Sequence, residues 1–85
     1  MKTLEYTVTD ALGIHARPAG ALAKEVKRFQ SRVAIQKGDR EAEASRLMAL
    51  MGLGVKCGDR ILVKVEGEDE EAAAAAVEAF LQANL

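Results

Sequence analysis

The sequence predicts an α+β fold in which a four-stranded sheet has helices on one face and water on the other, in the order β-α-β-β-α-β-α. Segments of alternating apolar and polar residues exchange with segments whose apolar residues recur every three or four positions. A hairpin-length link, residues 37–39, joins the second and third alternating segments, so these two strands pair antiparallel. Each strand has one polar face and each helix one apolar stripe, which favours packing of the helices on the other face.

The first half of the chain predicts a strand, a helix and a second strand. Residues 3–9 alternate, with Leu4, Tyr6 and Val8 on one face. Residues 16–29 form a helix, because their apolar stripe has the helical period: Ala19, Leu22, Ala23, Val26 and Phe29. Residues 32–36 alternate again and form the second strand.

An edge strand and a short helix follow. Residues 40–44 have little apolar surface, which is typical of a strand at a sheet edge. Ser45 is a candidate N-cap for the next helix. That helix covers residues 47–51, and Gly52 and Gly54 end it.

The last third predicts the central strand and the last helix. Residues 60–66 alternate strongly and form the central strand. Asp69 is a candidate N-cap, Glu70 and Glu71 lie in the first turn, where the helix dipole favours acids, and residues 72–85 form the last helix. The inner stripe of this helix contains Ala73, Val77, Phe80 and Leu81.

Composition restricts the class of protein. A chain of 85 residues builds one compact core, so we expect a single domain, residues 1–85, and a monomer. The 12 lysines and arginines are balanced by 13 acids, which argues against nucleic acid as the main partner. We expect no membrane insertion, because no apolar run is long enough to span a bilayer. The single cysteine, Cys57, and the lack of an apolar leader favour the cytoplasm. One histidine and one cysteine do not make a metal site, and we expect no cofactor.

The stretch from Gly13 to Ala19 holds the only histidine and the only proline of the chain. It lies where the first strand pattern stops and the helical pattern begins, so His15 falls at the helix N-cap. The first backbone N–H groups of the helix, at Ala16 and Arg17, then need an acceptor. A phosphoryl group on His15 would be that acceptor, and the Arg17 guanidinium can clamp phosphate oxygens. The pattern therefore predicts that His15 is a nucleophile that accepts a phosphoryl group and passes it on.

The motif Gly13-Ile14-His15-Ala16-Arg17-Pro18-Ala19 resembles the phosphohistidine signature of HPr, the phosphocarrier family of the bacterial sugar phosphotransferase system. The chain length, the order of elements and a second signature, Leu47-Met48-x-x-Met51-x-Leu53-Gly54, extend the resemblance over essentially the whole chain. It implies an open-faced β-sandwich, a four-stranded antiparallel sheet with three helices on one face. It also implies that enzyme I phosphorylates Nδ1 of His15, using phosphoenolpyruvate, and that the group passes to the IIA domains of sugar permeases. Such a protein is a carrier with a covalent phosphohistidine rather than a stand-alone enzyme.

Three large residues of the short helix, Leu47, Met48 and Met51, have two interpretations. Their helical spacing fits a core. However, so short a helix does not easily bury three large residues, and methionines suit surfaces that meet several partners. In HPr proteins this helix lies beside the active histidine and forms the docking patch. Four basic residues would then form a rim for acidic partner faces, although a solvated helix surface explains the lysines equally well: Arg17, Lys24, Lys27 and Arg46.

The regulatory serine of many HPr proteins has no direct counterpart here. Counting from His15, and back from Leu53, that position falls on Arg46. Ser45, one residue earlier, is the nearest candidate for seryl phosphorylation, and the arginine argues against such regulation. Regulatory proteins remain candidate partners.

Three alternatives stay open at this stage. A carrier of the nitrogen-regulatory branch, or a mainly regulatory paralogue, would use the same His15 chemistry with other partners. A hydrolase would need an acid or base oriented on His15; Asp10 is the only acid nearby in sequence, and nothing in the pattern directs it to the ring. A nucleic-acid-binding module would need aromatic side chains on the open sheet face, and the residues predicted there include none: Thr3, Glu5, Thr7, Arg60, Leu62 and Lys64.

Overall fold

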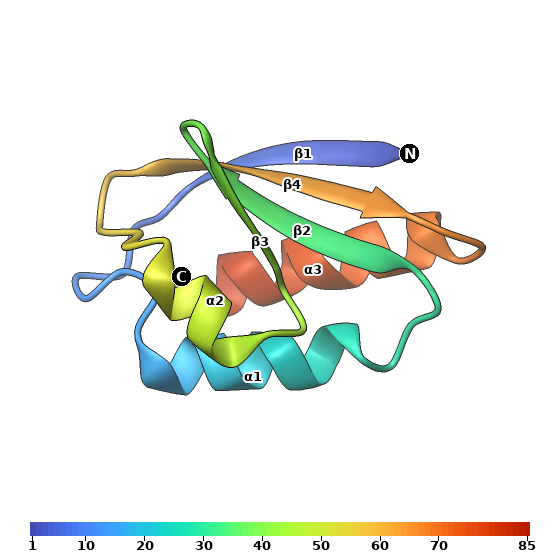
Figure 1. The fold of residues 1–85 in the computed structure, drawn as a ribbon, viewed down its shortest axis with the longest axis horizontal. Helices are drawn as coiled ribbons and strands as arrows, with labels where there is room; N and C mark the ends of the chain where they lie inside the picture. The colour runs from blue at the N-terminus through green and yellow to red at the C-terminus, as the bar shows by residue number, and fades with distance from the viewer.

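The computed structural model describes the whole chain, residues 1–85, and its elements follow the predicted order (Figure 1). None of the helices has the length and apolar character needed to cross a membrane. The elements are β1 (Lys2–Thr7), α1 (Ala16–Val26), β2 (Arg32–Lys37), β3 (Arg40–Glu43), α2 (Leu47–Gly52), β4 (Arg60–Glu66) and α3 (Glu70–Asn84).

The four strands form one antiparallel sheet in the order β1-β4-β2-β3. β4 is therefore central and β3 lies at an edge, as their residue patterns predict. The register places Val63 of β4 between Leu4 of β1 and Ile35 of β2. Because side chains alternate along a strand, this register aligns the apolar residues of three strands on one face.

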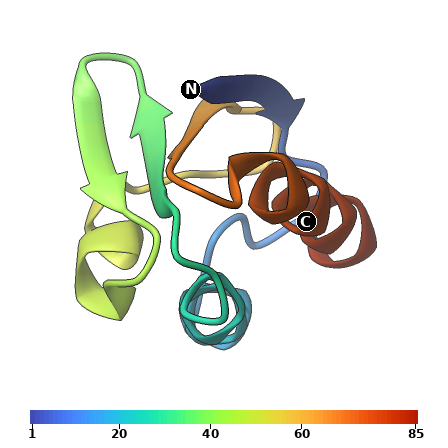
Figure 2. The ribbon, with the colours of Figure 1, turned by 90° about the vertical axis from the view of Figure 1, so that its right-hand side faces the viewer.

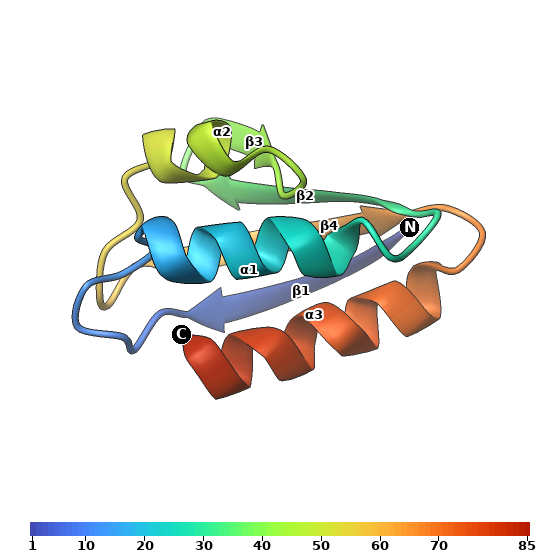
Figure 3. The same ribbon diagram turned by 90° about the horizontal axis from the view of Figure 1, so that it is seen from below.

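All three helices cover that face, which confirms the predicted fold class (Figures 1 and 2). Figure 3, seen from the helix side, shows α1 between α2 and α3. The core between the two layers is aliphatic, and Leu22, Val63 and Val77 have no exposed surface. Full burial of each such side chain contributes roughly 1.5–3 kcal/mol, so both layers stabilise the fold.

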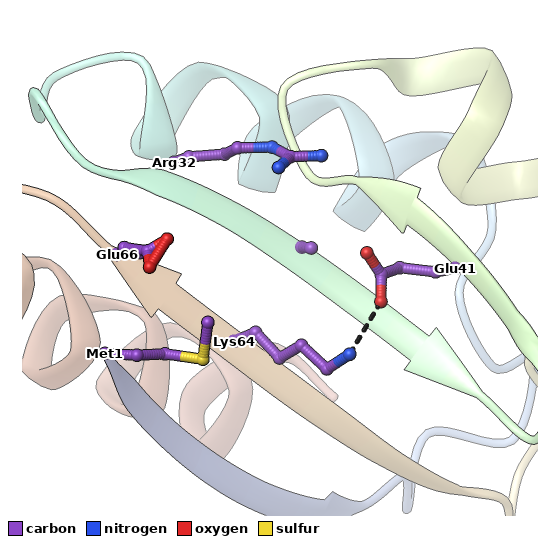
Figure 4. Close-up of a pocket in the computed structure, with 6 residues that line it drawn as sticks. Met1, Arg32, Glu41, Lys64 and Glu66 are labelled. Carbon is purple, nitrogen blue, oxygen red and sulfur yellow. Dashed lines mark hydrogen bonds and ion pairs between the residues drawn. The ribbon is translucent and has the colours of Figure 1, made fainter.

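The other face of the sheet is polar, and some of its charges form ion pairs. Lys64 Nζ lies 2.8 Å from Glu41 Oε1, and Arg32 Nε lies 2.6 Å from Glu43 Oε1. The hydrogen bond from Lys64 holds the pKa of Glu41 below its usual range. Figure 4 shows Lys64 and Glu41 at a shallow hollow of about 150 Å³ on this face. None of the predicted site residues lines this hollow.

The Asp69 carboxylate explains why one predicted boundary, the end of α1, is wrong. The helix predicted to reach Phe29 ends at Val26. The backbone N–H groups of Gln30 and Ser31 instead donate to the Asp69 carboxylate, each at 2.9 Å. Asp69 is the N-cap of α3, as predicted, but its side chain makes no capping hydrogen bond to that helix because it accepts hydrogen bonds from the α1–β2 loop.

Other boundaries differ by one or two residues. Ser45 is not the N-cap of α2: it lies in the preceding turn, and Arg46 occupies the cap position with an extended backbone. β1 ends at Thr7 rather than Thr9, since the Thr9 N–H donates to Leu85 O outside the sheet. α3 begins at Glu70, so Glu70 and Glu71 lie in its first turn as predicted, and it ends at Asn84 rather than Leu85.

Candidate functional site

The loop between β1 and α1 is anchored at both ends by backbone hydrogen bonds. Near its start, the N–H groups of Thr9 and Asp10 donate to the carbonyl of Leu85, a buried residue that follows α3. Near its end, the Ile14 N–H donates to Val55 O at 3.1 Å. The two anchors fix the position at which α1 begins.

Gly13 makes the second anchor possible. Its φ is +68°, and a Cβ at this position would lie 2.2 Å from Val55 O, so no other residue fits without moving the backbone. The segment that contains Val55 is itself held by Asp59. The Asp59 carboxylate accepts a hydrogen bond from Lys56 N at 2.8 Å and pairs with Lys37 Nζ at 2.9 Å. The hydrogen bond from Lys37 holds the pKa of Asp59 below its usual range.

His15 occupies the N-cap of α1, as its place between the two sequence patterns predicts. Its backbone is extended, its carbonyl accepts the Ala19 N–H at 3.0 Å, and its side chain makes no capping hydrogen bond. The backbone N–H groups of Ala16 and Arg17 have no acceptor within the protein. The third helical residue is Pro18, which has no N–H. Two donors and the positive end of an 11-residue helix thus converge next to the imidazole.

A hollow of about 250 Å³ opens at this helix end and brings His15 and Arg17 together. Both predicted residues are accessible: His15 is half-buried and Arg17 is exposed. Asn84, at the end of α3, lines the same hollow, and its Nδ2 donates to Phe80 O at 3.0 Å. Sequence reasoning missed Asn84 because only the packing of α3 brings residue 84 to residue 15.

Asp10 also lines the hollow and approaches the ring, for which the sequence pattern gave no reason. Asp10 Oδ1 lies 3.9 Å from His15 Nε2. The same oxygen accepts the Leu12 N–H at 2.8 Å. This side-chain-to-backbone turn folds the loop back and carries the carboxylate to the histidine. The Asp-x-x-Gly spacing of Asp10 and Gly13 was the available signal for such a turn.

The short helix α2 presents its large residues to solvent. Met48 is 76% exposed, Leu47 38% and Met51 37%, whereas Leu50 on the opposite side is fully buried. The surface interpretation therefore applies to Leu47, Met48 and Met51, and the core interpretation of these three residues is wrong. We call Leu47, Met48 and Met51 the α2 patch. Figures 1 and 3 both place α2 alongside the first half of α1, the half that begins at His15.

The four basic residues predicted to form a rim are all exposed, and none of them forms an ion pair: Arg17, Lys24, Lys27 and Arg46. Some other cations of the chain do have acidic partners, as Arg28 does with Glu25 at 2.8 Å. At 1.5 Å per residue, Lys24 and Lys27 lie roughly 13–18 Å along α1 from His15. They line a flank of the surface rather than the hollow itself. Ser45 is half-buried in the turn before Arg46.

Comparison with known proteins adds to this geometry. The PTS-HPr family model, described as the PTS HPr component phosphorylation site, matches residues 2–83. The phosphocarrier protein HPr of Lysinibacillus sphaericus is 40% identical over 81 residues, 95% of this chain and 92% of that protein. The structure of HPr from Thermoanaerobacter tengcongensis superposes with a TM-score of 0.92 at 30% identity, covering 98% of this chain and 93% of that one. Crh of Bacillus subtilis, a catabolite repression protein seen as a swapped dimer, superposes with a TM-score of 0.79 at 32% identity, covering 100% and 98%. The family match over nearly the whole chain, together with the shared fold, shows that this chain belongs to the HPr family of phosphocarriers of the phosphotransferase system.

Proposed function

We propose that Nδ1 of His15 accepts a phosphoryl group from phosphorylated enzyme I and donates it to the IIA domains of sugar permeases. The observation that carries this proposal is the start of α1. There a histidine meets two backbone N–H groups without protein acceptors, those of Ala16 and Arg17. The Arg17 guanidinium belongs to the same hollow. This arrangement suits an anion bonded to the ring.

The transfer is a simple exchange of bonds at phosphorus. The Nδ1 lone pair of His15 forms a bond to phosphorus while the bond to the donor atom breaks and its electron pair leaves with the donor. The two N–H groups and Arg17 then hold the equatorial oxygens and spread their charge. At the IIA domain the same steps run in reverse, which requires that the site bind the group without trapping it.

The partners dock, in this proposal, on the α2 patch and the basic residues around it. Exposed methionines adapt to differently shaped apolar surfaces, which suits a carrier that meets both a donor and several acceptors. Four cations without acidic partners in the chain can pair with acidic partner faces and accelerate encounter. In this proposal the chain acts as a cytoplasmic monomer with one domain and without a cofactor.

Labelling of His15 tests the central step. We expect enzyme I and phosphoenolpyruvate to place one acid-labile phosphate on the protein, detected by ³¹P NMR and by mass spectrometry with and without acid. His15→Ala should fold normally, by circular dichroism, and remain unlabelled, because the chain has no other histidine. Acid-labile phosphate on His15→Ala would refute the assignment. Acid-stable phosphate on Ser45 would instead indicate seryl regulation.

The alternative is a carrier of the nitrogen-regulatory branch or a mainly regulatory paralogue. The similarity to Crh, named as a catabolite repression protein, is the observation that favours the regulatory paralogue as a second candidate function. Both alternatives use the same His15 chemistry, so the donor distinguishes them. Rapid labelling by the sugar-branch enzyme I supports the sugar carrier, whereas labelling by the nitrogen-branch enzyme alone would contradict it.

A further inference from the structure

Asp10 is the one ionisable side chain that approaches the ring of His15 without a part in the proposed transfer. Its Oδ1 lies 3.9 Å from Nε2, the ring nitrogen that does not take the phosphoryl group. We infer that Asp10 is a positioning residue: its carboxylate holds the proton of His15 on Nε2 and so leaves the Nδ1 lone pair free. This inference rests on the proposed function of His15.

The carboxylate is held in place independently of the histidine. Asp10 N donates to Leu85 O at 2.8 Å, and Asp10 O accepts the Gly13 N–H at 3.0 Å. Its Oδ1 accepts the Leu12 N–H at 2.8 Å. An anchored acid beside a half-buried histidine keeps its position through the reaction, which is the property that an orienting group needs.

The chemistry follows from the two tautomers of imidazole. A neutral ring has one N–H and one lone pair, and the hydrogen bond made by one nitrogen decides which form is populated. An acceptor at Nε2 favours the form with Nε2–H, whose lone pair is on Nδ1. The separation of 3.9 Å exceeds a good hydrogen bond by about 1 Å. A modest rotation about the broad χ2 torsion of histidine closes that gap.

The proton stays on Nε2 throughout the transfer. When the Nδ1–phosphorus bond forms, the ring gains positive charge, and the Nε2–H becomes a stronger donor to the carboxylate. When the group leaves, the electron pair of the Nδ1–phosphorus bond returns to Nδ1. No acid or base is consumed, so Asp10 acts without itself being protonated.

The size of the effect is set by exposure. About a third of each side chain is accessible, 36% for His15 and 32% for Asp10. Ion pairs this accessible are worth up to about a factor of five in an equilibrium constant. We therefore expect Asp10 to adjust the ring rather than to be indispensable.

Asp10→Asn is the main test, because the amide keeps an oxygen for the Leu12 N–H and removes the charge. The ratio of the Nε2–H to the Nδ1–H form of His15, read from ¹⁵N chemical shifts, should fall about two- to fivefold. The rate of phosphorylation by enzyme I should fall by a similar factor. Both differences from the parent protein should shrink between about 0.1 M and about 1 M salt, which a purely structural role would not cause.

Two further variants complete the test. Asp39→Asn changes an exposed acid in the β2–β3 turn and should leave both quantities at the parent values. Asp10→Ser also keeps a short acceptor without charge. It should lower the tautomer ratio and the phosphorylation rate as Asp10→Asn does, so the test still stands if one of the two variants loses stability. Parent-like tautomer ratios in both Asp10 variants would overturn the inference while leaving His15 labelling intact. Loss of labelling in the parent protein would instead overturn the proposed function.

Discussion

Arg17 is the residue on which the proposed phosphate clamp depends, and its surroundings make it a clean target. It is exposed at the second position of α1, lines the hollow with His15 and forms no ion pair. Arg17→Ala should therefore preserve the fold and slow phosphoryl transfer about tenfold or more, since a hydrogen bond to a charged group contributes roughly 1.5–3 kcal/mol. Stopped-flow or quench-flow transfer rates measure this.

Arg60 offers the matched control for that experiment. It is also exposed and without an ion pair, but it starts β4 on the other layer. Arg60→Ala should transfer phosphate at the parent rate. Equal rates for Arg17→Ala and the parent would show that the two backbone N–H groups suffice.

The places of His15 and Arg17 at the start of α1 could be predicted from sequence because their signal is local. A unique histidine at a change of periodicity identifies a helix start, and the chemistry proposed for that helix start stays a prediction. Asp10 and Asn84 could not be assigned in the same way. Asp10 approaches the ring through a side-chain turn onto Leu12, and Asn84 comes to line the same hollow through the packing of α3. Both depend on geometry that hydrophobic periodicity does not encode.

At the scale of elements, α2 has one buried side and one exposed apolar side. Leu50 is buried in the core, and the α2 patch faces solvent. Met48→Asp should leave stability nearly unchanged, because Met48 is 76% exposed. It should weaken enzyme I binding at least several-fold, since a charge would be buried in an apolar interface.

Calorimetric titration with enzyme I measures the effect of Met48→Asp. Ala72→Asp, on the exposed side of the first turn of α3, introduces the same charge where the helix dipole favours it. That control should bind enzyme I as the parent does. If both variants bind equally well, the α2 patch is not the docking surface.

Asp69 connects two elements, and its charge makes the connection depend on pH. Its carboxylate accepts the Ser31 hydroxyl at 2.6 Å and the Gln30 N–H at 2.9 Å. The hydrogen bond from Ser31, followed by that from Gln30, holds the pKa of Asp69 below its usual range. Because the folded-state pKa is the lower one, the stabilisation is present above the unfolded-state pKa of about 3.9 and is lost as pH falls through the folded-state value.

Asp69→Asn should accordingly lower the Tm at neutral pH, and the difference from the parent should narrow as the pH falls below about 4. Glu68→Gln removes the neighbouring exposed charge, which forms no ion pair, and should leave the Tm nearly unchanged. Thermal scans from neutral to acidic pH measure both. A Tm difference for Asp69→Asn that did not vary with pH would contradict this account.

The contact between Asp69 and the α1–β2 loop explains why the presence of α1 could be predicted but its C-terminal boundary could not. The apolar stripe of α1 continues to Phe29, which packs partly against the core, so periodicity gives no stop signal at Val26. The stop comes from Asp69, about 40 residues later in the chain. Likewise Ser45 has the residue type of an N-cap, but the chain leaves β3 in a turn that places Arg46 there. In each case tertiary geometry decided against a local preference.

At the scale of the molecule, one aliphatic core joins the sheet to the helix layer, so a change on either layer should weaken both. Leu22 of α1 is fully buried against this core, whereas Leu12 in the β1–α1 loop is 71% exposed. Leu22→Ala should lower the free energy of unfolding by about 2–5 kcal/mol, and Leu12→Ala should change it by less than about 0.5 kcal/mol.

Urea unfolding tests this with two probes. Far-UV circular dichroism follows the helices, and the fluorescence of Tyr6, the only tyrosine in a chain without tryptophan, follows β1. The two curves should coincide for the parent and for Leu22→Ala, since a single core of this size unfolds as one unit. If the dichroism curve alone moved in Leu22→Ala, the helix layer would unfold separately from the sheet. The start of α1 would then depend for its position on the β1–α1 loop anchors alone.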